Sequence, residues 1–124
     1  MFKLSRIPDT ELEIMQAIWS NPTPITTSEV KAVLEQKRPW SIGALQTLLN
    51  RLIDRGFLES GMRGKSKTYV PIVGEEEYLA LESRSFLQRV TGNSVTRLVA
   101  SLYDSKSITD EDLDELRKFI NSKA

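Results

Sequence analysis

Residues 41–56, SIGALQTLLNRLIDRG, are the starting point for predicting the fold. Apolar residues recur here every three or four positions, which places them on one side of a helix with about 3.6 residues per turn. Ser41 is a favourable N-cap residue, and Gly56 is of the type that commonly follows the last turn of a helix. The segment therefore predicts a short helix with one buried side. That side consists of Leu45, Leu48, Leu49, Leu52 and Ile53.

The opposite side of this predicted helix has small, amide, hydroxyl and guanidinium groups and no acid before Asp54. A helix entering the major groove of DNA, about 12 Å wide, brings the side chains of its N-terminal part to the base edges. Ala44 can contact a thymine methyl group, amides can pair with adenine, and a guanidinium can reach guanine or phosphate. The candidate DNA-contacting residues are Ser41, Gly43, Ala44, Gln46, Thr47, Asn50 and Arg51.

Two shorter helices are predicted before this one. The first runs from about Asp9 to Ser20 and ends at a segment containing two prolines. The second follows Thr26, whose spacing to Glu29 is that of a capping box, and ends near Gln36. Three short helices with tight connections are typical of a helix-turn-helix domain, and Thr26 is included among its candidate DNA contacts.

A basic hairpin is predicted directly after the third helix. Phe57–Ser60 and Lys67–Val70 are its strands, residues 61–66 are a glycine-bearing turn, and Pro71 ends the second strand. A hairpin in this position is typical of the wing of a winged helix. Its cations are expected to lie along the minor groove or the phosphates, and they are Arg63, Lys65 and Lys67.

The distribution of charge supports contact with nucleic acid. The whole chain has a formal net charge of zero, but residues 37–73 have seven Lys and Arg against two acids, a net charge of +5. The segments before and after are net negative, at −2 and −3. One positive block in an otherwise acidic chain is typical of a protein with one face toward phosphate.

Three more helices are predicted after Gly74, with apolar residues at helical spacing. So short a chain cannot easily cover all of them with a core of its own, so we expect them to pack against a second copy across a two-fold axis. This places two recognition helices about one DNA turn, about 34 Å, apart. The candidate dimerisation residues are Phe86, Val95, Leu98, Val99, Leu102, Leu113, Leu116 and Ile120.

The predicted fold class is therefore mainly α. A winged helix-turn-helix domain, with three helices and a β-hairpin wing, is predicted for residues 1–73, and a helical dimerisation domain for residues 74–124.

The composition excludes several classes of function. The chain has no cysteine and no histidine, which excludes disulfides, thiolate metal sites and catalysis by either residue. The acids at 75–77 and 110–115 fit helix N-termini better than a metal site or a catalytic pair. We therefore expect no enzyme activity, metal or cofactor. No apolar run approaches the about 20 residues of a membrane span, and the first residues do not have the pattern of a signal peptide, so we expect a cytoplasmic protein without membrane insertion.

Two functions fit these features. The first is a transcriptional repressor that binds a palindromic operator as a homodimer. The alternative is a winged-helix module that binds another protein and no operator. The positive central block and the acid-free helix side favour the first.

A set of motifs in a fixed order extends over almost the whole chain. These motifs are Asp9–Met15, Ile18-Trp19, Thr27–Val30, Trp40-Ser41, Gln46-Thr47, Leu49, Arg51–Ile53, Gly56, Tyr69–Pro71, Ser83, Ser85–Leu87 and Asp112–Leu116. The set resembles the penicillinase-repressor family of the BlaI/MecI type, which represses β-lactamase or methicillin-resistance genes. The resemblance implies a homodimer with winged helices on a palindromic operator.

The resemblance also implies a way of releasing the operator. In the penicillinase repressors a protease cuts an Asn–Phe bond in the fifth helix; the aligned bond here joins Ser101 and Leu102, and a membrane sensor protease is an implied partner. Family members with a Lys-Thr pair early in the recognition helix differ from this chain, which has Gly43-Ala44. Its preferred operator is therefore expected to differ.

Overall fold

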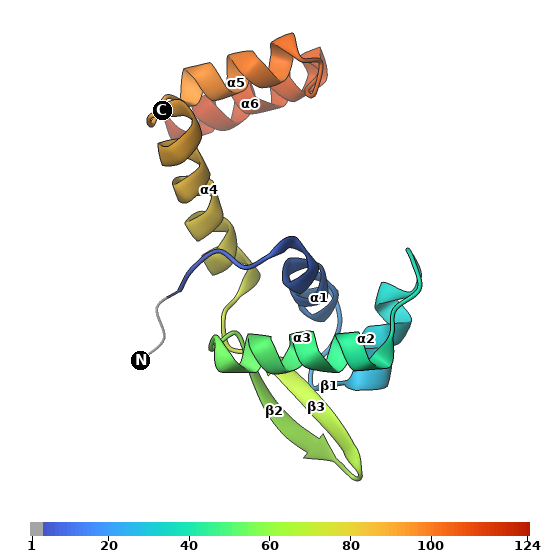
Figure 1. Cartoon of the computed structure of the whole chain (residues 1–124). Coiled ribbons are helices and arrows are strands. Elements are labelled where there is room, and N and C mark those ends of the chain that lie inside the picture. The colour runs from blue at the N-terminus through green and yellow to red at the C-terminus, as the bar shows by residue number, and fades with distance from the viewer. Residues whose placement is uncertain (1–3) are drawn as a thin grey trace. The chain divides into compact units, whose positions relative to one another are not determined.

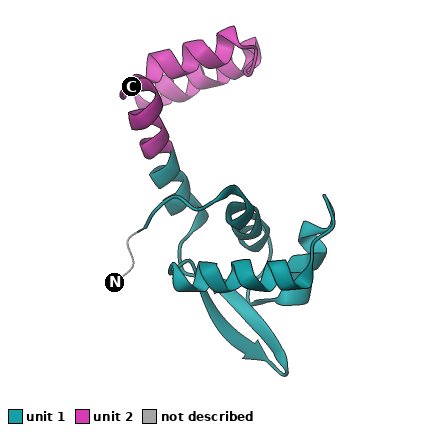
Figure 2. Cartoon of the chain, in the orientation of Figure 1, with its two compact units in different colours: residues 1–82 teal, residues 83–124 magenta. Residues whose placement is uncertain are grey.

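The computed structural model describes residues 4–124. The first three residues, which belong to the N-terminal segment compared above with a signal peptide, lie outside the described part. The described chain contains six helices and one three-stranded antiparallel sheet (Figure 1). The elements are α1 (Asp9–Trp19), β1 (Ile25–Thr26), α2 (Thr27–Leu34), α3 (Ile42–Asp54), β2 (Leu58–Arg63), β3 (Ser66–Pro71), α4 (Glu75–Thr91), α5 (Val95–Asp104) and α6 (Asp110–Lys123). The described residues form two compact units, which divide between Glu82 and Ser83 (Figure 2). The predicted fold class is confirmed, since the first unit has three helices and a β-hairpin in winged-helix order.

Side-chain caps define where α2 and α3 begin. The Thr26 hydroxyl accepts from the Glu29 amide at 3.2 Å, and the Glu29 carboxylate accepts from the Thr26 amide at 2.8 Å, so the predicted capping box is confirmed. The Ser41 hydroxyl accepts from the Ala44 amide at 3.1 Å and caps α3. Gly56 follows α3 with a φ of +81°, a conformation that glycine adopts without steric cost.

The hairpin differs from the prediction at its turn. Residues 61–66 were expected to form the turn, but only Gly64 and Lys65 separate the two strands. Gly64 has a φ of +61°, which a two-residue hairpin turn requires at its first position. The strand continues through Gly61, which lies opposite Thr68. Glycine is a weak strand former, so the pattern along the sequence did not indicate this extension.

The sheet has a third strand that the sequence did not predict. β1 pairs with β3, so that Ile25 lies opposite Tyr69 and Thr26 opposite Thr68. Two residues are too few to show the alternation that identifies a strand. The strand order is β1-β3-β2, which makes β3 central and buries both Thr68 and Tyr69.

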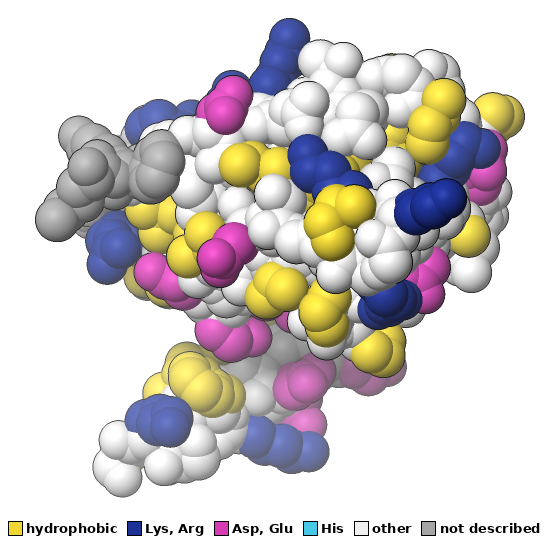
Figure 3. Space-filling model, turned by 90° about the horizontal axis from the view of Figure 1, so that it is seen from below, with side chains coloured by type: hydrophobic (Ala, Val, Ile, Leu, Met, Phe, Trp, Pro, Cys, Tyr) yellow, Lys and Arg dark blue, Asp and Glu magenta, His cyan; other side chains and the backbone are white. Residues whose placement is uncertain are grey.

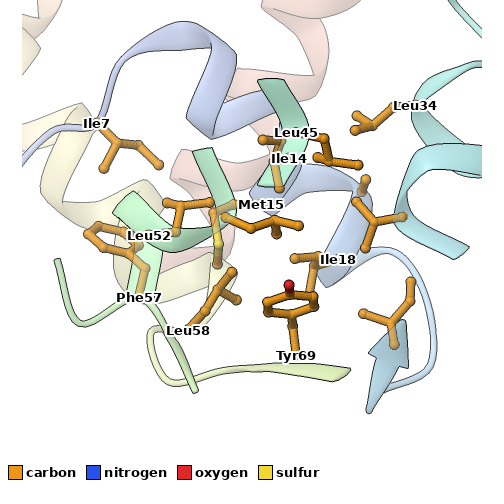
Figure 4. Packing of buried hydrophobic residues seen from close by; sticks show 14 of the residues in the cluster. Ile7, Ile14, Met15, Ile18, Leu34, Leu45, Leu52, Phe57, Leu58 and Tyr69 are labelled. Atoms are coloured by element: carbon orange, nitrogen blue, oxygen red, sulfur yellow. The ribbon is translucent and has the colours of Figure 1, made fainter. Parts of the chain in front are cut away.

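The core of the first unit lies between α1, α3 and the sheet (Figure 4). Leu45, Leu49 and Leu52 of α3 have no solvent-exposed surface, whereas Leu48 and Ile53, also expected there, are partly buried. Burial of each leucine contributes about 1.5–3 kcal/mol. The buried residues of α1 are Glu11, Ile14, Met15, Ala17 and Ile18. This packing fixes which side of α3 faces solvent.

An ion pair between a buried carboxylate and an exposed arginine side chain joins α1 to the end of α3. The Glu11 side chain is only 1% exposed, and Nε of Arg55, the C-cap residue of α3, lies 3.3 Å from its Oε1. A buried carboxylate is costly unless a positive group accompanies it. The sequence analysis did not predict this pair, because a contact between residues so far apart in sequence leaves no local pattern.

The first unit extends into α4. Tyr78 is buried; its hydroxyl accepts from the Ile7 amide at 2.8 Å and donates to Glu82 at 2.9 Å. Burial raises the pKa of Tyr78 to about 12, which extends the pH range over which its hydroxyl can donate further into the alkaline region. Trp19 also donates to the carbonyl oxygen of Val73, at 2.9 Å. These contacts continue the unit to residue 82, beyond the limit of 73 expected from the sequence.

The second unit comprises the rest of α4, α5 and α6. Thr109 and Asp112 form a capping box at the start of α6. Thr91 is the only buried residue among residues 83–124, so the apolar side chains of these helices are exposed or partly exposed. Among residues 4–124, no helix is both long and apolar enough to cross a membrane.

Candidate nucleic-acid interface

Two rows of side chains lie on the solvent side of α3. Residues four apart in a helix lie one above the other, and the leucines occupy the other side. The first row is Ile42, Gln46 and Asn50, and the second is Gly43, Thr47 and Arg51. We call these six residues the exposed face of α3. Gln46 is partly buried and the others are exposed, as is Ala44 beside them. The predicted residues of α3 therefore lie together on its solvent side, and Ile42, which the sequence analysis did not include, lies with them.

A polar network connects this face to the hairpin. The Gln46 amide nitrogen donates to Oδ1 of Asn50 at 3.3 Å and to the hydroxyl of Tyr69 at 3.1 Å. Nζ of Lys67 donates to the same Asn50 oxygen at 3.5 Å. The Thr47 hydroxyl donates to the carbonyl oxygen of Gly43, within its own helix. Lys67 thus lies beside the exposed face of α3, and a hydrogen bond to Tyr69 of β3 fixes the side chain of Gln46.

Tyr69 is a second residue of this site that the sequence analysis did not include. It has no exposed surface, and its hydroxyl accepts from Oγ1 of Thr27 at 3.2 Å and from Gln46. One oxygen of β3 therefore connects the first residue of α2 to α3. The available signal was a tyrosine in the second strand of the hairpin, since a buried tyrosine hydroxyl usually finds a partner.

The three wing cations differ in their contacts. Lys65 is exposed in the hairpin turn, and Lys67 lies beside Asn50 as well as over the ring of Tyr69, 5.7 Å from its centroid. Arg63 instead turns back: its Nη1 lies 3.3 Å from Oε1 of Glu29, and its Nη2 donates to the carbonyl oxygen of Pro24 at 2.6 Å. Arg63 thus ties the hairpin to the start of α2.

Two of the candidate DNA contacts, Thr26 and Ser41, also cap helices. Thr26 is buried, and its hydroxyl accepts from the Glu29 amide, so the structure does not present it with the exposed face of α3. Ser41 is exposed, and its hydroxyl accepts from Ala44.

The hydrogen bonds around Glu29 change its acidity. The amide and hydroxyl of Thr26 are the main causes, and together with the charge of Arg63 they hold the pKa of Glu29 below its usual value of 4.5. Glu29 therefore stays ionised in mildly acidic solution and keeps Arg63 in place.

Cations and exposed apolar groups occur together on the hairpin, where Met62 of β2 lies opposite Lys67 of β3. Figure 3 views the molecule from below, the direction in which the β2–β3 turn points in Figure 1; Lys and Arg lie there among hydrophobic and acidic side chains. Arg51 and Lys65 are exposed and Lys67 is partly exposed, so this surface offers cations of the kind that bind phosphates beside the side-chain amides of α3.

Comparison with known proteins identifies the family. The model of the penicillinase repressor family matches residues 7–122. The chain belongs to the penicillinase repressor family. This confirms the resemblance in the sequence motifs and places the chain among transcriptional repressors rather than enzymes.

Individual relatives match over nearly the whole chain. The penicillinase repressor of Bacillus licheniformis is 32% identical over 120 residues, covering 97% of this chain and 93% of the relative. The methicillin resistance regulatory protein MecI of Staphylococcus aureus (strain N315) is 26% identical and covers 98% of both chains. These matches include the second unit as well as the winged helix.

Two solved structures match the winged helix. The solution structure of the DNA-binding domain of the repressor BlaI is 38% identical, with a TM-score of 0.55, and covers 63% of this chain and 94% of that one. The monomeric form of Bacillus licheniformis BlaI, solved in complex with the blaP half-operator, matches over the same shares with a TM-score of 0.52.

Tyr69→Phe should lower the free energy of unfolding by about 1–2 kcal/mol, because it leaves Thr27 and Gln46 without their shared acceptor. Urea denaturation measures the loss. Tyr103→Phe is the matched control, since it removes an exposed hydroxyl bonded to Asp110 and should change stability by less than about 0.5 kcal/mol. Equal effects of the two substitutions would contradict the role assigned to Tyr69.

Glu29→Gln should reduce the acid sensitivity of the fold. The folded-state pKa of Glu29 is below 4.5, so the stability it contributes is present above that pH and is lost as pH falls through the folded-state value. Glutamine keeps an acceptor for the Thr26 amide but does not titrate. We expect the unfolding free energy of the wild type to fall more steeply below about pH 4.5 than that of the variant. Parallel curves would show that Glu29 contributes nothing to acid unfolding.

Proposed function

We propose that this chain is a transcriptional repressor that binds a palindromic operator as a homodimer, with the exposed face of α3 in the major groove. The observation that carries this proposal is the acid-free face of α3, held toward solvent by Leu45, Leu49 and Leu52. A helix fixed on one side can present its other side to base edges without rearrangement. The half-operator complex of the similar BlaI winged helix supports the same use of the domain.

The cations give this interface its affinity for DNA. We assign Lys65 and Lys67 to contacts with phosphates, and Arg51 of the second row to a phosphate or a guanine. The exposure of Lys65 and Arg51 and the position of Lys67 beside Asn50 support this. Each phosphate neutralised by a cation releases counterions, so binding weakens linearly with salt on a logarithmic scale. We assign Arg63 to the contact between the hairpin and the start of α2, since its guanidinium already pairs with Glu29 and donates to the carbonyl oxygen of Pro24.

The second unit supplies the dimer. Its apolar side chains lack cover within the unit, and Phe86, Val95, Leu116 and Ile120 are exposed, while Leu98, Val99, Leu102 and Leu113 are partly buried. Burying apolar surface contributes about 25 cal/mol per Å², and a two-fold partner offers an identical surface to each chain. A symmetric dimer then matches a palindromic operator with one winged helix per half-site.

Cleavage of the second unit is the proposed means of release. The Ser101–Leu102 bond lies inside α5, and cutting it separates Leu102 from Val95, Leu98 and Val99. A membrane sensor protease is the proposed partner for this step. An operator-binding repressor also acts where the chromosome is, which supports a cytoplasmic location.

Replacing Lys65 and Lys67 together with alanine should weaken binding to all duplexes alike. The slope of log affinity against log salt should become shallower by about 2, close to one for each lost phosphate contact. Fluorescence anisotropy over a salt series measures this slope. Lys118→Ala removes an exposed cation of α6 and is the control, which should leave the slope unchanged. An unchanged slope in the double variant would remove the hairpin from the DNA. A wild type with no salt-dependent duplex binding, but with a protein partner, would instead favour the interaction module.

Leu98→Asp should convert the dimer to monomer. A carboxylate within the apolar interface would be desolvated without a partner, and sedimentation velocity reports the change in mass. Ala100→Asp is the matched control, because this exposed position lies on another side of α5. A Leu98→Asp variant that stays dimeric would place the interface elsewhere.

A further inference from the structure

Ile42 is a large apolar side chain placed in solvent at the first residue of α3. It is 54% exposed, and it is the only large hydrophobic residue of α3 that is exposed. It lies one turn before Gln46, in the first row of the exposed face. Water is an unfavourable environment for such a group, and the core of the first unit does not include it.

The space beside Ile42 is open. A Cβ at the neighbouring Gly43 would meet only the Ser41 hydroxyl, at 3.7 Å. Gly43 is therefore not required by the packing of the chain itself. The absence of a side chain there lets another molecule approach the first turn of α3, beside Ile42.

The major groove offers one apolar group to such a side chain. The base edges there present donors and acceptors, and the 5-methyl group of thymine is the exception. The N-terminal part of a recognition helix is the part that contacts base edges. We propose that Ile42 packs against the 5-methyl group of one thymine in each half-site and thereby specifies thymine at that base pair. This inference rests on the proposed function, in which α3 enters the major groove.

Two other residues are less suited to this contact. Ala44 offers a single methyl group and lies two positions further along, on a different side of the helix from Ile42. Met62 is also exposed, but it lies in β2 of the hairpin, opposite Lys67. Ile42 is the large apolar side chain in the same row as the amides of Gln46 and Asn50.

The test removes the methyl group without changing any hydrogen-bonding group. The duplex is the operator selected by the full chain from random sequence, and each thymine of one half-site is replaced in turn by deoxyuridine. At one position the wild type should bind about fourfold more weakly, the effect of losing contact with about one methyl group. Ile42→Ala should bind the thymine duplex more weakly than the wild type does, and should bind the thymine and deoxyuridine duplexes equally.

Ile72→Ala is the matched control. Ile72 is similarly exposed, at 58%, but it lies near the C-terminal end of α3, away from Ile42. Its amide donates to the carbonyl oxygen of Phe57, which follows that end of the helix. This variant should keep the wild-type response to deoxyuridine. A wild type indifferent to deoxyuridine at every position, or a selected half-site without thymine, overturns the inference. An Ile42→Ala variant that keeps the response also overturns it and assigns the contact to another residue, such as Ala44. A chain that binds no duplex contradicts the proposed function itself.

Discussion

Burial of Leu45, Leu49 and Leu52 against α1 and the sheet is the constraint on which the interface depends. Successive residues of a helix are about 100° apart around its axis, so these three side chains determine the direction of every other residue in α3. A different rotation of the helix would bury Gln46 and expose leucine. The winged helix therefore holds one narrow face of α3 toward solvent. The polar side chains on that face can be exchanged without changing the packing of the buried leucines.

Polar contacts then fix the two ends of the helix. At its C-terminal end the buried Glu11 pairs with Arg55, and nearer its N-terminal end Gln46 bonds to Tyr69. Both pairs join residues far apart in the chain. The two polar pairs restrict sliding of α3 along α1. Leucine packing alone resists such sliding less strongly, because apolar contact has little directionality. Tyr69 also bonds to α2, so the helix-turn-helix and the hairpin share one hydroxyl group.

The sequence predicted those features of the fold that depend on residues close together in the chain. Helix limits followed from caps such as Thr26 and Ser41, and the buried side of α3 followed from its period. The sequence did not predict β1, the length of the hairpin strands or the contacts of Arg63, because these depend on pairing between distant segments. The sequence analysis assigned Ile42 to neither side of the helix, and only the packed structure shows this side chain in solvent. The dimer residues stay a prediction, since their partner is another chain.

The most direct test of the account is an NMR titration of the full chain with its selected duplex, following backbone amides and the side-chain amides of Gln46 and Asn50. The account predicts that the largest shifts fall on the exposed face of α3 and on the hairpin turn at Gly64 and Lys65, with α1 little changed. A duplex of scrambled sequence should shift the hairpin more than α3. Shifts centred on α1, or none on α3, would contradict the claim that the buried leucines hold a DNA-reading face toward solvent.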